Sequence, residues 1–279
     1  MFLQETFFIL FYIYKSLKMF PFLDLKFIKI PMYGLCILTG LIIASFVSYS
    51  FCKKRQKNFF DFIIVVACTL GIGFTCAKLL FILVTYPLKD FFRVIYLMLF
   101  KGRTDLLEGG FVFYGGAIGG VLGYLLGIKI AKCKLTDFTD FFAVLIPLVH
   151  GFGRIGCFCS GCCYGIPYEG PFSVIYTHPL STVPTGIGIF PVQLLESLLL
   201  FILFFVLYIL FIKKVPHLIF GYFISYAVIR LITEHFRYDN ERGFLLGLST
   251  SQFISILIIL FSVILLVIMN IRKKRNVNK

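Results

Sequence analysis

The stretch HGFGRIGCF, residues 150–158, decides the fold because it places Arg154 inside a long apolar segment. A cation in the hydrocarbon of a bilayer costs at least about 2.5–3.5 kcal/mol on insertion scales, so it needs an anionic partner or a water-filled cavity. A phospholipid supplies one anion, the phosphodiester of its headgroup. The stretch therefore predicts a membrane helix with a functional charge, and a lipid headgroup is a candidate ligand.

The composition predicts a polytopic membrane protein. Of the 279 residues, 59% are hydrophobic, and no segment of soluble-domain length interrupts the apolar runs. We therefore expect a single transmembrane domain over residues 1–279. The net charge of +14 does not indicate nucleic-acid binding, because much of it lies in short clusters beside the apolar runs, where it sets topology.

Seven transmembrane helices are predicted, because only helices satisfy their own backbone hydrogen bonds in lipid. Each is near the roughly 20 residues needed to cross a bilayer. They cover residues 30–51, 62–86, 109–131, 141–159, 190–212, 217–236 and 250–271. The fold class is thus all-α. Residues 1–28 form an external or interfacial segment, with an interfacial helix over 1–22, and residues 86–108 and 160–189 form external loops or arms.

Fourteen basic residues follow the first, third, fifth and seventh spans. The positive-inside rule makes that side cytoplasmic, with the N-terminus outside and the C-terminus in the cytoplasm. Arg154, Glu196, Arg230 and Glu234 then fall in the outer half of their helices. Two cations and two anions at matching depth predict a polar cavity open to the outer leaflet, although snorkelling anchors or structural ion pairs are the alternative.

The sixth span carries a polar face. Arg230, Glu234 and Arg237 are spaced i, i+4 and i+7, and Tyr226 lies one turn before Arg230. One interpretation is an Arg–Glu pair that lowers the cost of insertion. The other is that Glu234 orients an arginine toward a phosphate, which the planar guanidinium fork binds through two parallel hydrogen bonds.

The third span carries glycines at strict four-residue spacing, namely Gly115, Gly119, Gly123 and Gly127. Small residues at this spacing let two membrane helices approach closely. We predict that this stripe is a helix-packing surface.

The motifs together resemble those of the prolipoprotein diacylglyceryl transferase family. HGFGRIGCFCSGCCYG, residues 150–165, is similar to the family signature, and RLITEHFR, residues 230–237, is similar to a second motif. Further matches are Tyr33-Gly34, FYGG at 113–116, and His178-Pro179 followed by Gln193 and Glu196. Their order along the chain agrees with seven spans.

The resemblance implies an enzyme of the bacterial plasma (inner) membrane whose active site faces the outer leaflet. Family members transfer a diacylglyceryl group from phosphatidylglycerol to the lipobox cysteine thiol in the signal peptide of a prolipoprotein. A thioether forms and glycerol 1-phosphate leaves. The expected partners are phosphatidylglycerol, the prolipoprotein signal peptide and membrane lipid, with no nucleic acid, no cofactor and no metal.

The resemblance also implies the site residues. The expected catalytic residues are Arg154, Arg230, Tyr114 and Glu234, with the arginines stabilising the charge on the departing phosphate. The expected substrate-binding residues are Arg154, Tyr33, Cys157, Gly165, Gln193, Glu196, Arg237 and His150. The chain departs from the family pattern at four positions: Tyr114 replaces a histidine, Cys157 replaces an asparagine, and Ser160 and Cys162 replace an asparagine and a glutamate. The general base is then either Tyr114 or His150.

Four cysteines cluster at Cys157, Cys159, Cys162 and Cys163. Cys159 and Cys162 have the C-x₂-C spacing of zinc sites, but no second such pair follows elsewhere. Packing or substrate contact is therefore the favoured interpretation, with a disulfide or a metal as alternatives.

Two rival functions fit the same residues. A non-catalytic lipid or anion transporter would use the same basic cavity, but the chain lacks the internal repeat typical of transporters. A membrane thiol-redox protein would depend on Cys159 and Cys162 and would tolerate Arg154→Lys.

Overall fold

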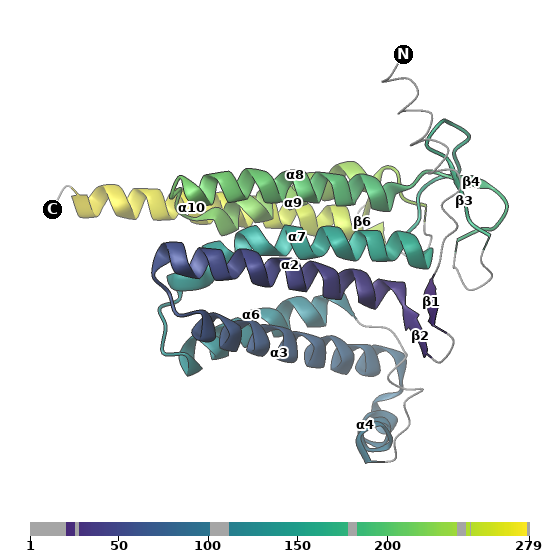
Figure 1. Ribbon diagram of the computed structural model, residues 1–279, viewed down its shortest axis with the longest axis horizontal. Helices are drawn as coiled ribbons and strands as arrows, with labels where there is room; N and C mark the ends of the chain where they lie inside the picture. Colours follow the sequence, from purple (N-terminus) through teal and green to yellow (C-terminus); the bar gives the residue numbers. More distant parts are fainter. Residues whose placement is uncertain are drawn as a thin grey trace. The chain divides into compact units, whose positions relative to one another are not determined.

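The computed structural model describes residues 21–25, 28–100, 112–177, 183–238, 244–245 and 247–277. Within these residues, seven helices of 17 residues or more coincide with the seven predicted spans to within a few residues (Figure 1). They are α2 (Met32–Arg55), α3 (Phe59–Thr85), α6 (Phe113–Ile130), α7 (Thr136–Ser160), α8 (Val192–Ile212), α9 (Leu218–Glu234) and α10 (Thr250–Val277). The interfacial helix predicted for residues 1–22 lies almost wholly outside the described residues.

Five of the helices, α2, α3, α7, α8 and α10, are long and apolar enough to cross a membrane. The apolar part of α6, Gly115–Ile130, is shorter, and α9 has 17 residues. Large hydrophobic side chains are exposed along these helices, for example Val121 on α6 and Phe205 on α8. A soluble protein rarely exposes so much apolar surface, and lipid covers it in a membrane. A mostly helical, polytopic membrane protein is therefore confirmed, while the count of seven spans and their orientation stay predictions.

The contacts divide the chain into two compact units. One comprises Met1–Val47 with Thr139–Lys279, and the other comprises Ser48–Phe138. Helix α2 contributes to both. The functional residues that the sequence analysis singled out lie in the first unit, except Tyr114, which lies in the second.

In the second unit, α3 and α6 pack through the predicted glycine stripe. A Cβ atom on Gly123 would overlap the carbonyl oxygen of Cys68 and lie 2.8 Å from Cα of Thr69. Gly119 is equally close to Cys76, at 2.5 Å from its Cβ. The backbones thus touch where a side chain would separate them, which confirms the stripe as a packing surface.

The predicted arm over residues 86–108 contains short helices in its described part. These are the 3₁₀ turn η1 (Leu88–Asp90) and α4 (Phe91–Phe100). Residues 101–108 of the arm lie outside the described residues.

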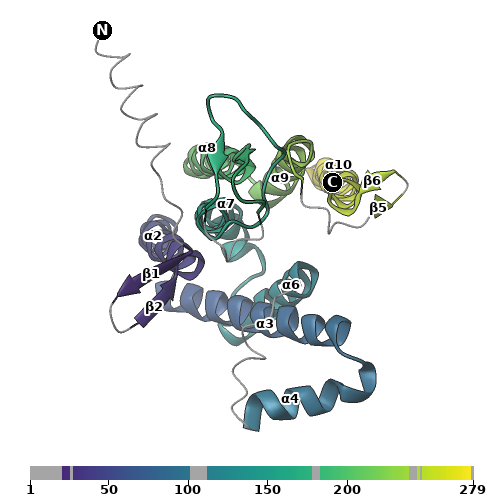
Figure 2. The same ribbon diagram turned by 90° about the vertical axis from the view of Figure 1, so that its right-hand side faces the viewer.

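In the first unit, α7 contacts α2, α8 and α9. Gly40 of α2 packs on Phe152, and Gly151 packs on Phe201 of α8. At the other end of α7, Asp140 Oδ1 accepts a hydrogen bond of 3.1 Å from the backbone N–H of Leu218, at the start of α9. Figure 2 looks along these helices and shows α7 beside α8 and α9, with α10 beside α9.

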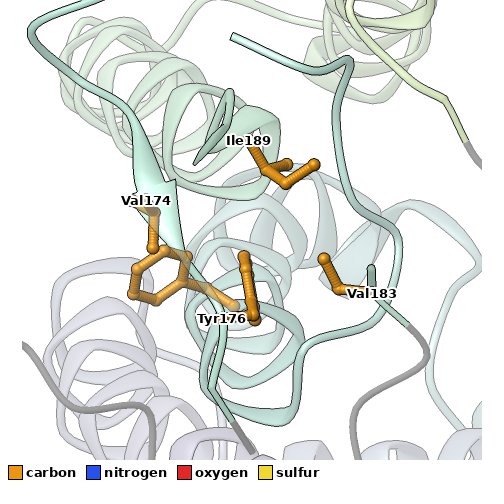
Figure 3. Packing of buried hydrophobic residues seen from close by; sticks show 5 residues of the cluster. Val174, Tyr176, Val183 and Ile189 are labelled. Atoms are coloured by element: carbon orange, nitrogen blue, oxygen red, sulfur yellow. The ribbon is translucent and has the colours of Figure 1, made fainter. Parts of the chain in front are cut away.

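Three short antiparallel hairpins were not predicted. They are β1 (Phe22–Leu25) with β2 (Ile28–Pro31), β3 (Val174–Ile175) with β4 (Gly188–Ile189), and β5 (Phe244–Leu245) with β6 (Leu248–Ser249). The β3–β4 hairpin organises the connection that follows α7. Its small core joins Phe158 of α7 to Val174, Tyr176, Val183 and Ile189 (Figure 3). The predicted loop of residues 160–189 is therefore a folded cap in its described part.

The glycine stripe gives the first testable prediction. Gly123→Ala should destabilise the protein by about 1–3 kcal/mol, because its Cβ meets backbone atoms that cannot move aside. Gly120→Ala on the same helix is the matched control, since nothing lies within 4 Å of its Cβ position. Thermal unfolding of the detergent-purified proteins measures the difference. Equal melting temperatures for the two variants would contradict the packing assignment.

Candidate functional site

Three helices bring four charged side chains into one ion cluster. Arg154 Nη2 of α7 lies 3.0 Å from Glu196 Oε1 of α8. Arg230 Nη1 of α9 lies 3.6 Å from the other oxygen of Glu196, and Arg230 Nη2 lies 3.1 Å from Glu234 Oε2. The i, i+4 spacing of Arg230 and Glu234 predicts an ion pair, and the structure confirms that contact. It also shows that Glu196 joins the two arginines.

The cluster sits near one end of its helices. Arg154 lies six residues before the end of α7, Glu196 is the fifth residue of α8, and Arg230 lies four residues before the end of α9. At about 1.5 Å per residue, all three are within about 10 Å of that end. The topology predicted that these charged residues lie at the same depth, and the helix boundaries agree with that prediction.

The cluster is buried and its charges balance. The side chains of Glu196 and Glu234 are 2% and 3% exposed, and those of Arg154 and Arg230 are 13% and 11% exposed. Removing charged groups from water costs several kcal/mol each, and only close opposite charges compensate that cost. Glu196 contacts both arginines, so its loss would remove the carboxylate that Arg154 contacts and leave Arg230 paired with Glu234.

Each arginine has one buried nitrogen without a hydrogen bond in the described part of the chain, namely Arg154 Nε and Arg230 Nη1, and the latter still faces Glu196 Oε2 at 3.6 Å. Arg230 Nη2 also donates to Ser251 Oγ of α10 at 3.1 Å, so this guanidinium is held by two carboxylates and a hydroxyl. Arg154 Nε is buried and makes no hydrogen bond within the described part of the chain. Arg154 therefore keeps a donor for a ligand, and an anion is the natural acceptor.

Aromatic rings form one wall of the cluster. The ring of His150 lies 5.0 Å from that of Tyr226, and Tyr226 stacks on Tyr222 at 6.0 Å, both between centroids. Tyr226 also contacts Arg154. Tyr226 thus lies beside both Arg154 and His150, which is one of the two predicted bases.

Tyr33 and Cys157 lie beside the same end of α7. Gly156 allows this approach, because its Cβ position is 3.0 Å from Cα of Tyr33. The structure therefore brings the predicted residues Tyr33 and Cys157 to the neighbourhood of Arg154.

Gly165 and Arg237 pair through their backbones in an isolated antiparallel bridge. The adjacent Ile166 N–H donates to Phe236 O at 2.9 Å, and Phe190 N–H donates to Ile166 O at 2.9 Å. A Cβ atom on Gly165 would overlap Phe190 O and lie 2.8 Å from Phe236 O. Only glycine fits here, and the bridge fixes where Arg237 leaves α9.

Gln193 ties α8 to the cap. Its Nε2 donates to Cys162 O at 2.8 Å and to the Tyr176 hydroxyl at 3.3 Å, and its side chain is fully buried. Its Oε1 has no hydrogen-bond partner among the described residues. Gln193 thus holds the cap in register with the ion cluster and keeps one acceptor unused.

Five cysteines gather at this end of the first unit in two groups. The sulfur atoms of Cys157, Cys162 and Cys163 all lie within 4.8 Å of one another. Cys159, which the sequence paired with Cys162, instead forms a thiol contact with Cys36 of α2. Hydrogen bonds from Cys157 and Cys162 lower the pKa of the Cys163 thiol, and Arg154 and Arg237 add to this effect against the opposing effect of burial.

Tyr114 belongs to the second unit, and its side chain is outside the described part of the structure, so its role stays a prediction. Ser251, which holds Arg230, was missed. A signal for it exists, because Ser249 and Gln252 form a reciprocal capping box that starts α10 and places Ser251 in its first turn.

Glu196→Gln tests the central position of this carboxylate. The change keeps the shape but removes the charge between two arginines, so we expect a loss of about 3–5 kcal/mol in stability. Glu169→Gln is the control, because Glu169 is exposed on the cap. Thermal unfolding in detergent compares them, and a Glu196→Gln protein as stable as the control would exclude the proposed charge balance.

Gly165→Ala tests the backbone bridge that places Arg237. The added methyl group meets two carbonyl oxygens, so the bridge should open and activity should fall at least about tenfold, as expected for misplaced site residues. Gly221→Ala is the control, since its Cβ would meet only Leu207 Cδ2, at 3.8 Å. Initial rates of both variants, measured at equal amounts of folded protein, give the comparison. Full activity of Gly165→Ala would refute the role of the bridge.

The comparisons with known proteins agree with this geometry. A family model described as prolipoprotein diacylglyceryl transferase matches residues 21–268. A protein of Clostridium tetani named phosphatidylglycerol–prolipoprotein diacylglyceryl transferase is 35% identical over 254 residues, which cover 88% of this chain and 96% of that protein. A protein of Clostridium perfringens named phosphatidylglycerol–prolipoprotein diacylglyceryl transferase 2 is 31% identical over 242 residues, covering 85% and 90% of the two chains. The chain belongs to the prolipoprotein diacylglyceryl transferase family.

Proposed function

We propose that this protein transfers a diacylglyceryl group from phosphatidylglycerol to the lipobox cysteine of prolipoproteins. The observation that carries the proposal is the buried cluster in which Glu196 holds Arg154 and Arg230 while Arg154 Nε stays without a partner among the described residues. A guanidinium fixed by a carboxylate on one edge and free on another suits a phosphate ester. The family membership and the names of the relatives agree with this substrate.

The reaction breaks the bond between a glycerol carbon and a phosphate oxygen. The substrate thiolate attacks that carbon, the carbon–sulfur bond forms, and glycerol 1-phosphate leaves with the electron pair of the broken bond. Negative charge grows on the departing phosphate, and a preorganised cation in a low-dielectric site stabilises it. We assign this contact to Arg154.

Arg230 and Glu234 act on the same step through Glu196. Arg230 is held by Glu196, Glu234 and Ser251, so its charge is fixed in place before substrate binds. This arrangement orients Glu196, which in turn orients Arg154. The thiol proton goes to His150, whose ring lies near the cluster, or to Tyr114.

The remaining predicted residues fit substrate binding. Tyr33 and Cys157 lie beside the end of α7 that carries Arg154, and Gly165 and Arg237 form the bridge next to it. We propose that these residues, with Gln193 and His150, contact the lipid headgroup or the signal peptide of the prolipoprotein.

We also propose seven spans with the N-terminus outside and the C-terminus in the cytoplasm. The basic residues Lys53, Lys54 and Arg55 end α2, and Lys213 and Lys214 follow α8, at the end opposite Glu196. The positive-inside rule then places the ion cluster toward the outer leaflet of the plasma (inner) membrane. A phospholipid and a translocated signal peptide meet on that side.

Arg154→Lys tests the function. Lysine keeps the charge but cannot present two donors in a fixed fork, so the rate should fall by about 10²–10³-fold, as for loss of one preorganised donor. Arg93→Lys is the control, because Arg93 is exposed on α4. The assay incubates the purified protein with phosphatidylglycerol and a lipobox peptide and detects the thioether by mass spectrometry.

Two outcomes would contradict the proposal. One is the absence of thioether with the wild-type protein under conditions in which a known transferase is active. The other is equal rates for Arg154→Lys and the control. Lipid or anion flux in vesicles without any thioether would instead favour the transporter.

A further inference from the structure

Three thiols converge where α7 ends. The sulfur atoms of Cys157, Cys162 and Cys163 all lie within 4.8 Å of one another. A Zn–S bond is about 2.3 Å long, so two thiolates on a tetrahedral zinc ion lie about 3.8 Å apart. A shift of about 1 Å in the side chains would therefore give the three sulfurs the spacing of ligands to one ion.

The backbone explains why these three cysteines meet. Gly161 adopts a left-handed conformation with φ of 69°, and its N–H donates to Phe158 O at 3.2 Å. The N–H of Cys162 donates to Cys157 O at 3.1 Å. These two bonds form a Schellman motif, which sets the residue after the glycine against the residue five positions earlier. Cys162 thus returns to Cys157.

Cys163 then joins the pair, because it is itself left-handed, with φ of 56°. Non-glycine residues adopt this conformation rarely and at a cost in energy. Gln193 holds the turn from α8 by its hydrogen bond of 2.8 Å to Cys162 O. The three thiols are therefore placed by two structural elements rather than by a free loop.

We propose that Cys157, Cys162 and Cys163 bind one thiophilic divalent metal ion of the zinc type, with its fourth position open to the thiol of the substrate. Soft sulfur ligands select such ions over magnesium or calcium. Three protein ligands and one open position are the arrangement of catalytic rather than structural zinc. The occupant of the fourth position rests on the proposed function, whereas the metal site itself does not.

The charges around the thiols suit such an ion. Three thiolates and a divalent cation sum to one negative charge, and Arg154 and Arg237 both act electrostatically on Cys163. The site is also partly shielded from solvent, because Cys157 is buried and the other two are half-buried. An anionic metal–thiolate centre would therefore have two cations beside it.

The metal would promote deprotonation of the substrate thiol, which the residues near Arg154 promote only weakly. A thiol that coordinates zinc loses its proton, which passes to solvent or to His150. Its sulfur then attacks the glycerol carbon, the carbon–oxygen bond breaks, and glycerol 1-phosphate leaves with that electron pair. The metal is neither oxidised nor reduced, so the step needs no further reactant.

Cobalt titration tests the site, because Co²⁺ replaces zinc and absorbs in the near ultraviolet when thiolates bind it. Reduced, full-length protein in detergent is expected to bind one Co²⁺ with the charge-transfer intensity of three thiolates. Cys163→Ser should lower the affinity at least about tenfold. Cys159→Ser is the matched control and should leave the spectrum unchanged, because Cys159 contacts Cys36 outside the cluster.

Three outcomes would overturn the metal site. The first is the absence of saturable cobalt binding, and the second is an equal effect of the two serine variants. The third is a disulfide between two of the three cysteines that is present in the isolated protein, survives mild reduction and prevents cobalt binding.

A second arm tests the fourth position. A lipobox peptide with its cysteine should shift the visible bands of the bound Co²⁺, and the same peptide with serine should not. Equal spectra would show a closed site and remove the substrate thiol from the proposal. The cobalt titration contains no lipid, so its result does not depend on the transferase assay. Cobalt binding by a protein that is inactive in the transferase assay would refute the proposed function alone. Transferase activity in a protein that binds no cobalt would refute the metal site alone.

Discussion

One carboxylate organises the functional end of this molecule. Glu196 reaches Arg154 on one side and Arg230 on the other, so a single buried charge links helices α7, α8 and α9. In a low-dielectric interior the position of each charge is constrained by the others, because moving one away leaves its partner buried and uncompensated. The cluster therefore fixes the relative placement of three helix ends, and it leaves Arg154 Nε without a hydrogen-bond partner in the described part of the chain.

The cap after α7 places the second set of groups around this cluster. Backbone pairing of Gly165 with Arg237 joins the cap to the end of α9, and Gln193 joins it to the start of α8. Its small apolar core closes on Phe158 of α7 (Figure 3). Polar side chains from separate parts of the sequence are thereby held at one helix end. A site that must bind a lipid headgroup and a peptide thiol needs this combination of fixed charges and a fixed loop.

Part of this arrangement could be predicted from the sequence. The apolar runs predicted the long helices, the spacing of Arg230 and Glu234 predicted their ion pair, and the glycine stripe predicted the packing of α3 on α6.

The bridging position of Glu196 could not be predicted, because its two partners lie 42 and 34 residues away on other helices and no local spacing encodes such contacts. The hairpins were missed because strands of two to four residues are too short to show a clear alternating pattern. The cysteine trio was missed because C-x₂-C spacing favoured Cys159, whereas the left-handed turn selects Cys163.

A structure of the protein with a bound phosphonate analogue of phosphatidylglycerol shows directly whether Arg154 contacts the headgroup. We expect a phosphonate oxygen within hydrogen-bonding distance, about 3 Å, of Arg154 Nε, with Glu196 still bridging the two arginines. A headgroup bound elsewhere, with Arg154 Nε still without a partner, would contradict it.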